Sequence, residues 1–272
     1  MCNFKTTLFI FLILSLTVCQ PVEVKLPDTH TPVVEAYLFA GKTLDSIRIT
    51  ETYSYTSTDT NLLTLDQLDV SVSDGINVYK LNSIGQGYYQ NNEHIIESGK
   101  QYSLNFTYNQ LPVSATTFIP EKNTAAISVT EIEIEQITEF PGPGGGFQQN
   151  QESVDIQWGN SGDYYYVVLQ NKEENPEYIN TFLNSVRFRP QFRIISKPTI
   201  TDFYSINPQR DLPQYGQYRI IVFRVNPEYA SLYEISNNTS QSIAQPPTNI
   251  TNGLGIFTGV SSDTLFLKVI KK

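Results

Sequence analysis

Short runs of alternating apolar and polar residues dominate the first half of the chain. Between residues 33 and 120 the runs VVEAYLF, DSIRITETY, LDVSVSDG, INVYKL, GYYQ, YSLNFTY and VSATTFIP follow one another at regular spacing. A period of two places alternate side chains on the two faces of an extended strand. Asp74-Gly75, between two such runs, is a typical hairpin turn. Short strands at this spacing predict a small β-sandwich over residues 33–120.

A second β-rich unit is expected from residue 121 to residue 272. ISVTEIEIEQI is typical of one long strand, SVDIQWGNSGDYYYVVLQ resembles the paired strands of a fibronectin type III domain with Trp158 in the core, and YRIIVFRVN and DTLFLKVI supply later strands. Prolines and glycines predict a flexible loop at 141–152, and Pro227 opens a helix predicted near 227–243. The fold class is therefore mainly β, with two immunoglobulin- or fibronectin-III-like β-sandwich domains and a short helical insertion in the second.

The N-terminus has the features of an export signal. Lys5 precedes the apolar run LFIFLILSL, which suits the core of a signal peptide and is too short to cross a bilayer as a helix. The segment LTVC, ending at Cys19, resembles the lipobox of bacterial lipoproteins, in which cleavage precedes a cysteine that carries the lipid. We therefore expect residues 1–18 to be a signal peptide, Cys19 to be lipidated and residues 19–32 to form a tether. An ordinary secretory signal with a chance cysteine is the alternative.

Charge and cysteine content narrow the class of protein. The chain has 18 basic and 27 acidic residues, for a net charge of −9, which disfavours binding to nucleic acid or to anionic lipid. Its two cysteines are Cys2 and Cys19, so the body beyond the tether has no disulfide and depends on its hydrophobic core.

Residues suited to hydrolytic or metal chemistry are sparse and scattered. His30 lies in the tether and His94 is expected in a surface loop, and no Gly-x-Ser-x-Gly elbow accompanies them. Glu131, Glu133 and Glu135 share one face of a strand, where a solvated surface is favoured over a calcium site. The sequence predicts no catalytic residue, no metal and no cofactor, with a hydrolase that uses paired Asp or Glu residues as the less favoured alternative.

Tyrosine is abundant, with 17 residues, and it occurs in clusters. A tyrosine ring has an apolar body and a polar hydroxyl, which suits binding surfaces. Alternation places Tyr164 and Tyr166 on the face of a strand opposite Tyr165. We therefore take Tyr88, Tyr89, Tyr164 and Tyr166 as candidate binding residues for a glycan or a protein. Ordinary sheet propensity is the alternative explanation.

A C-terminal motif accompanies these features. NPEYASLY is followed by a spacer and by PPTNITNGLGIFTGV, and the earlier segments PVVEA, VSVSDG and TFIP occur with it. Together they resemble the Bacteroidota lipoprotein family called domain of unknown function 4249, over about residue 33 to the end. The motif N-I-x-x-G-L-G-I-F places Asn249, Gly253, Gly255 and Phe257 as candidate binding residues in a partner-facing loop. The alternative is that this segment is a turn before a final strand, with backbone angles or close contacts that require glycine.

The resemblance implies a location and a role. Members of that family look like outer-membrane lipoproteins, often encoded beside TonB-dependent receptors, and no catalytic residues are established for them. We therefore expect a non-enzymatic lipoprotein, lipid-anchored in the outer membrane on its surface or periplasmic face. It would act as the accessory or binding subunit of a TonB-dependent receptor in nutrient capture or uptake. The alternative is a stand-alone surface lipoprotein that binds a glycan or a peptide.

Overall fold

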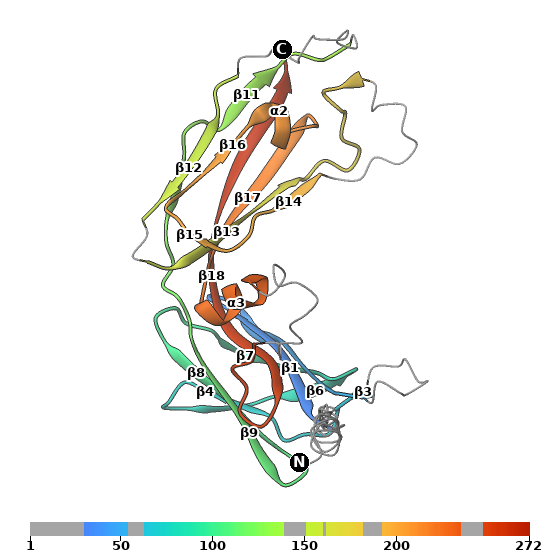
Figure 1. Ribbon diagram of the computed structural model, residues 1–272, viewed down its shortest axis with the longest axis vertical. Coiled ribbons are helices and arrows are strands. Elements are labelled where there is room, and N and C mark those ends of the chain that lie inside the picture. Colours follow the sequence, from blue (N-terminus) through green and yellow to red (C-terminus); the bar gives the residue numbers. More distant parts are fainter. Residues whose placement is uncertain (1–29, 54–62, 139–150, 160–161, 182–191, 235–246) are drawn as a thin grey trace, which may run out of the picture.

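The computed structural model describes residues 30–272 apart from residues 54–62, 139–150, 160–161, 182–191 and 235–246. The described residues form two β-rich units stacked along the long axis of the molecule (Figure 1). The predicted signal peptide, Cys19, most of the tether, nearly all of the 141–152 loop and the second half of the 227–243 helix lie outside the described residues.

The N-terminal unit is a sandwich of two sheets. One sheet runs in the order β1-β2-β7-β6, with β3 beside β2, and the other in the order β5-β4-β8-β9. Each run predicted between residues 33 and 120 overlaps one of these strands, and Asp74-Gly75 lies in the β4–β5 hairpin. The strands are β1 (Pro32–Phe39), β2 (Thr43–Glu51), β3 (Leu63–Thr64), β4 (Ser71–Ser73), β5 (Val78–Lys80), β6 (Asn82–Gly85), β7 (Tyr88–Ile95), β8 (Gln101–Tyr108) and β9 (Leu111–Phe118).

The two sheets of this unit enclose one hydrophobic core. In β1 the alternate residues Val34, Ala36 and Leu38 are buried, as the period of two predicts. Tyr89 of β7 and Tyr102 of β8 are among the largest buried side chains in the same core. Burial of these apolar side chains is the main stabilising term for a body without disulfides.

The C-terminal unit is a second sandwich with its own core. One sheet runs β14-β13-β17-β18, with β11 beside β18 and β15 beside β13, and through β18 (Leu254–Lys271) it is continuous with the β1-β2-β7-β6 sheet of the N-terminal unit. The facing sheet runs β10-β12-β16. Trp158 is buried in this core, as predicted, and its indole N–H donates to the carbonyl of Thr201 at 2.9 Å. The strands are β10 (Ala125–Ile127), β11 (Glu131–Ile134), β12 (Val154–Trp158), β13 (Tyr164–Asn171), β14 (Arg193–Ile195), β15 (Thr199–Ile200), β16 (Phe203–Ile206) and β17 (Gly216–Val225).

Two sequence expectations differ from the observed strands. ISVTEIEIEQI forms no single strand, because the chain passes from one sheet to the other between β10 and β11. At the bend the N–H of Ser128 donates to the carbonyl of Asp155 (2.8 Å), and the N–H of Asp155 donates to Ser128 Oγ (3.0 Å). The segments expected to pair as β12 and β13 lie instead in facing sheets, since β12 pairs with β10 and β16.

One long strand, β18 (Leu254–Lys271), belongs to both units (Figure 1). Residues 254–260 pair in parallel with β1, and residues 260–269 pair antiparallel with β17. The predicted boundary assigns all of residues 121–272 to the second domain, whereas Ile250 and Phe257 lie in the N-terminal core. The chain thus returns to its first unit to complete that core before it ends in the second.

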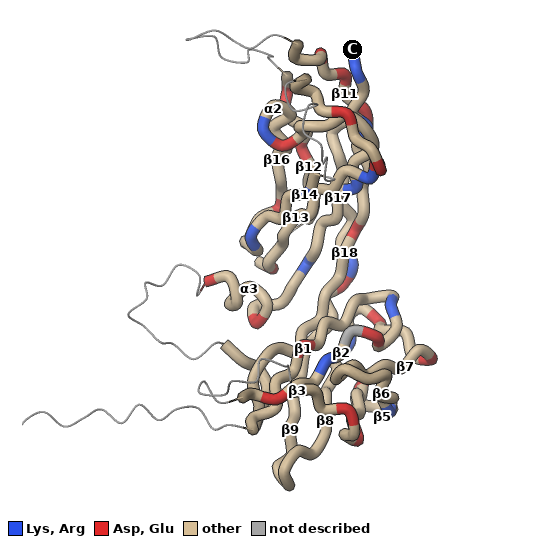
Figure 2. The backbone as a smooth tube through the Cα atoms, turned by 90° about the vertical axis from the view of Figure 1, so that its right-hand side faces the viewer, with Lys and Arg blue, Asp and Glu red and all other residues tan. Residues whose placement is uncertain are grey.

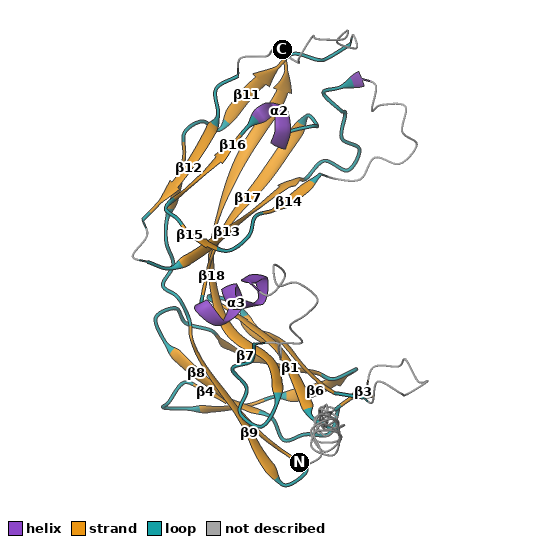
Figure 3. Cartoon of the chain, viewed as in Figure 1, coloured by secondary structure: helices purple, strands orange, loops and turns teal. Residues whose placement is uncertain are grey.

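Two helices are present among the described residues (Figure 3). α2 (Pro208–Asp211) lies in the C-terminal unit, and α3 (Pro227–Glu234) lies against β18 where the two units meet. α3 begins at Pro227, as predicted, because proline lacks the N–H that a first helical residue would leave unpaired. In the part of the chain that the structure describes, no helix has the length and apolar character to cross a membrane.

Candidate functional site

Tyr88 and Tyr89 lie on opposite faces of β7. Tyr88 is 37% exposed, and the guanidinium of Arg48 lies 4.9 Å from its ring centre, a cation–π contact. Tyr89 is fully buried; its hydroxyl donates to the carbonyl of Leu65 (2.6 Å) and accepts from the N–H of Leu68 (3.0 Å). Burial raises the pKa of Tyr89. Tyr89 therefore holds the segment before β4 in place through these hydrogen bonds. Of the two tyrosines, only Tyr88 faces solvent.

Tyr164 and Tyr166 lie on the face of β13 that points away from the core, and both are half-buried. The ring of Tyr166 stacks on Phe223 with centres 4.7 Å apart and on Tyr229 of α3 at 5.5 Å. Tyr229 also meets Tyr37 of β1 edge-on at 6.2 Å. Burial raises the pKa of Tyr166. At Tyr166 the expected aromatic platform is thus covered by α3, and it joins the two units.

The motif residues Asn249 and Phe257 form a clamp at the start of β18. The Asn249 side-chain amide donates to the carbonyl of Phe257 (2.7 Å), and Asn249 Oδ1 accepts from the Phe257 N–H (3.0 Å). Two residues later the N–H of Gly259 donates to Thr117 Oγ1 at 2.9 Å. β17 reaches this edge of β18 only from Val260 onward, so side chains satisfy the backbone groups before it.

Gly253 and Gly255 let β18 lie closely against β1. Gly255 has a φ of +98°, and a Cβ there would lie 2.0 Å from the carbonyl oxygen of Val34. A Cβ at Gly253 would lie 3.0 Å from the carbonyl oxygen of Pro32. At Gly255 only glycine fits such an approach, whereas at Gly253 a side chain would be tightly packed against Pro32 and Ile250. The four motif residues therefore gather at the start of β18, whereas the candidate tyrosines lie on β7 and β13, so the predicted residues form no single site.

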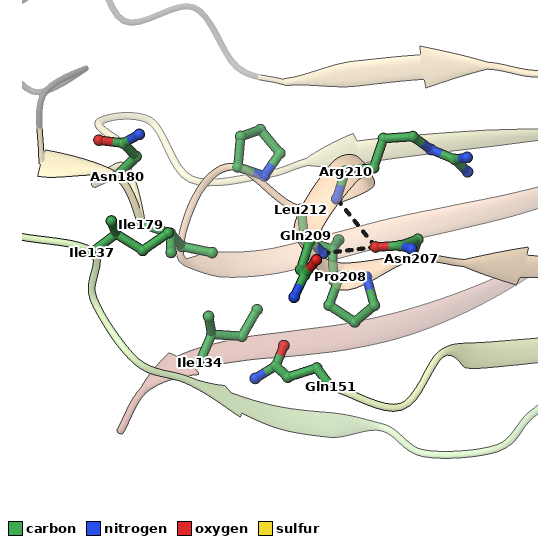
Figure 4. Close-up of a pocket in the computed structure, with 11 residues that line it drawn as sticks. Ile134, Ile137, Gln151, Ile179, Asn180, Asn207, Pro208, Gln209, Arg210 and Leu212 are labelled. Carbon is green, nitrogen blue, oxygen red and sulfur yellow. Dashed lines mark hydrogen bonds between the residues drawn. The ribbon is translucent and has the colours of Figure 1, made fainter. Parts of the chain in front are cut away.

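A pocket that the sequence does not reveal lies at the far end of the C-terminal unit. Its volume is about 470 Å³. Its walls come from β11, α2 and the segments that flank β11, β12 and β13 (Figure 4). The lining residues are Ile134, Ile137, Gln151, Ile179, Asn180, Asn207, Pro208, Gln209, Arg210, Leu212 and Pro213.

α2 forms one wall of the pocket, and its start is tightly fixed. Asn207 is the N-cap, and its Oδ1 accepts from the N–H groups of Gln209 (3.0 Å) and Arg210 (3.3 Å), the dashed lines of Figure 4. The buried carboxylate of Asp211 accepts from the N–H of Asn207 (2.9 Å) and from both ends of the Arg210 guanidinium (2.7 and 2.9 Å). The wall is therefore set in place before any ligand arrives.

The chemistry of the pocket suits binding. Ile134, Ile179 and Leu212 are buried and give it an apolar floor, while amide side chains and Arg210 give it a polar rim. Small-molecule sites commonly combine an apolar lining with a few polar groups that orient the ligand. The sequence offers no signal for this site, because its residues come from separate segments and include no charged pair or motif.

His94 lies in a polar cluster of the N-terminal unit, in β7 and not in the expected loop. Its ring stacks on Tyr79 with centres 3.6 Å apart, and its Nε2 lies 3.1 Å from the hydroxyl of Tyr102. The Tyr79 hydroxyl donates to Asp74 at 2.8 Å. Burial lowers the pKa of His94, although the carboxylates of Asp74 and Glu97 oppose the shift.

We expect the N-terminal unit to lose stability as the pH falls from 7.5 to 5.5. The folded-state pKa of His94 lies below the unfolded value of about 6.5, so protons bind the unfolded chain more tightly. The stability that neutral His94 contributes is fully present above pH 6.5, the unfolded pKa, and is lost as the pH falls through the folded-state pKa. His94→Phe keeps the stacked ring and should flatten the dependence of the urea midpoint on pH. Equal slopes for the variant and the parent chain would exclude His94 as the source.

The acidic row of β11 behaves as a surface. Figure 2 shows acidic positions, in red, along the backbone near β11. Glu131 and Glu133 are exposed, and Glu131 pairs with Lys268 on β18 at 2.9 Å. Among the described residues, no three His, Cys, Asp or Glu side chains are grouped as a metal site.

The chain is similar to a known sequence family and, distantly, to a solved structure. The family model described as Domain of unknown function (DUF4249) matches residues 20–265. A solved structure named "Anomalous substructure of Titin-A168169" is 10% identical, covers 89% of this chain and 99% of its own, and has a TM-score of 0.23. A search of curated proteins finds no match. The family match therefore spans both units and most of β18.

Proposed function

Because the chain belongs to the family described as Domain of unknown function (DUF4249), we propose that it is a non-enzymatic, lipid-anchored binding protein of a Bacteroidota outer membrane. It serves as the accessory or binding subunit of a TonB-dependent receptor in nutrient capture or uptake, and the pocket of the C-terminal unit holds the cargo. The family membership, the lipobox-like LTVC segment and the lined pocket support this proposal.

The observation that carries the proposal is the course of β18. Its start pairs with the start of β1, which follows the predicted tether, and its end pairs with Ile134 in the pocket wall. Eighteen residues at about 3.3 Å each make a strand of roughly 60 Å. One continuous strand thus connects the tether end of the molecule to the pocket end, so an anchor at Cys19 holds the pocket away from the bilayer.

The anchor has an energetic role in this proposal. A lipid confines the body to the membrane that holds the receptor, which raises the effective concentration of a weak contact without a large interface. The polar rim and modest volume of the pocket suit a ligand that is bound reversibly. Capture and release are both needed by a subunit that passes cargo on.

Cys19→Ala should release the protein from the membrane. Two or more acyl chains give stable anchoring, whereas the apolar run before Cys19 is removed with the signal. We expect more than about tenfold less of the variant in the membrane fraction and no incorporation of labelled palmitate. Cys2→Ala is the matched control and should keep both. Membrane retention of Cys19→Ala at the parent level would contradict the anchor.

Extraction of the membranes in mild detergent tests the receptor role. A tagged copy should bring down a TonB-dependent receptor in near-equal amount, and Cys19→Ala should bring down much less. Recovery of the lipoprotein alone from intact membranes would contradict the accessory role. That result would favour the stand-alone binding of a glycan or peptide, for which the lined pocket is the supporting observation.

A further inference from the structure

The outer edge of β11 carries backbone groups that a further strand can use. Among the described strands, β11 pairs with β18 alone. The N–H groups of Lys268 and Lys272 donate to the carbonyls of Thr130 and Ile134, so the peptide groups of these even-numbered residues face β18. Because backbone groups alternate in direction along a strand, those of Glu131 and Glu133 face outward. An edge of this kind accepts an extended peptide.

Gln151 already occupies part of this edge. Its Nε2 donates to the carbonyl oxygen of Glu133 at 2.6 Å, as the N–H of a neighbouring strand would. Its Oε1 is buried and has no hydrogen-bond partner among the described residues. A buried acceptor without a donor is unfavourable, by about 1–3 kcal/mol in general. An N–H group that enters beside Gln151 would satisfy it.

An acidic groove follows the same edge. It has a volume of about 420 Å³ and is lined by Glu133, Glu152 and Asp155 together with serines and apolar residues, with no lysine or arginine in its lining. It meets the pocket of the C-terminal unit, because Gln151 and Pro208 line both. Strand edge, acidic groove and apolar pocket are thus continuous.

We propose that this groove binds a short, extended, cationic peptide as cargo, with its backbone added to the outer edge of β11 and an apolar side chain in the adjoining pocket. The inference rests on the proposed function and names its ligand. The three carboxylates complement lysine or arginine side chains. Alternate residues of the peptide then face the groove and the pocket, as strand geometry requires.

The size of the site favours a short peptide over a protein surface. The groove and the pocket have volumes of about 420 and 470 Å³, each within the range of small-ligand sites of about 300–1,000 Å³. A glycan would also meet the polar rim, but it has no row of N–H groups to match the carbonyls of a strand edge. The backbone groups of β11 therefore separate the two ligand classes.

Fluorescence anisotropy with the full-length chain in detergent tests the inference. The probe is a labelled heptapeptide that alternates lysine and valine, and its matched control alternates glutamate and valine. A third peptide keeps the lysines but is N-methylated at alternate residues, which removes N–H donors and leaves the charge. We expect the lysine peptide to bind at least about tenfold more tightly than either control.

A double variant in the groove and a single-site control variant outside it locate the binding. Glu133→Lys with Glu152→Lys should weaken the lysine peptide by about tenfold or more, because both side chains are exposed and the fold should not depend on them. Glu93→Lys is the control for a charge reversal outside the groove, to be compared per substitution; Glu93 is exposed and lines a pocket of about 540 Å³ in the N-terminal unit. It should change the affinity by less than about twofold.

The outcomes are distinct. Equal affinity for the lysine, glutamate and N-methylated peptides, no binding of any of them, or equal loss in the groove and control variants would overturn the peptide inference. A receptor that still co-purifies would then leave the proposed function standing with another cargo. If the peptide binds at the groove but no receptor co-purifies, the peptide inference stands and the accessory role does not. The protein would then bind the peptide on its own.

Discussion

Gly255→Ala should lower the free energy of unfolding by more than about 4 kcal/mol and prevent β18 from pairing with β1. The added Cβ would lie 2.0 Å from the carbonyl oxygen of Val34 and 2.9 Å from its nitrogen. Val34 is fully buried in the N-terminal core, so β1 has no room to retreat. The φ of +98° adds backbone strain for any residue with a side chain.

Gly41→Ala is the matched control for this prediction. Gly41 also has a positive φ, of +77°, but a Cβ there meets no atom within 4 Å. It should cost only the backbone strain, about 1–2 kcal/mol. Urea unfolding followed by far-ultraviolet circular dichroism compares the two variants, with Trp158 fluorescence as a separate report from the C-terminal core. Similar midpoints for the two variants would show that close packing of β18 on β1 is not required.

Asn249→Ala should lower the free energy of unfolding by roughly 2–4 kcal/mol. The substitution removes both hydrogen bonds to the backbone of Phe257, a fully buried residue, and leaves its N–H and carbonyl without these partners. β17 pairs with this edge of β18 only from Val260 onward, so no neighbouring strand can replace the hydrogen bonds that the Asn249 side chain makes to Phe257.

Asn252→Ala tests whether the position of the amide matters. Asn252 is exposed, donates one hydrogen bond to the carbonyl of Pro112 at 2.8 Å, and has a φ of +56° that alanine tolerates less well, so Asn252→Ala should cost about 1–2 kcal/mol, less than Asn249→Ala. The same urea titration measures both variants. An Asn249→Ala protein as stable as Asn252→Ala, but deficient in receptor binding, would restore the partner-facing interpretation of the motif.

The period of two predicts much of this fold. The runs before residue 120 contain strands because their alternate apolar residues fill a one-sided core, as in β1 and β8. Trp158 and Pro227 are also placed as predicted, since a lone large aromatic residue belongs in a core and a proline starts a helix readily.

The pattern of apolar and polar residues gives no sign that β18 belongs to both units. Six successive residues, 256–261, are buried, because the strand is covered on both faces where it crosses between the units. A continuous buried run has no period of two, and the interpretation of the motif as a loop or turn left the first half of the strand, residues 254–262, unpredicted. The glycines that suggested a turn serve instead to bring β18 close to β1.

The pocket and the groove also escape prediction, for a different reason. Gln151, Asn207 and Ile134 are ordinary residues in segments far apart in the chain, and they meet only through the pairing of β11 with β18 and the packing of α2. Conversely, the clusters that did attract attention, Tyr166 and Asn249 among them, are engaged in internal contacts. Residue type alone does not show whether a group of aromatic side chains forms an exposed binding surface or packs between two units of the same chain.

In the proposed function, the far end of the C-terminal unit is the ligand- and receptor-binding end of a membrane-tethered protein. A photo-crosslinking amino acid at Gln209, on the pocket rim, and one at Gln101, exposed on β8, test it in intact cells. We expect adducts to the receptor or to its peptide cargo from position 209 and none from position 101. Adducts from position 101 alone, or equally from both, would contradict it.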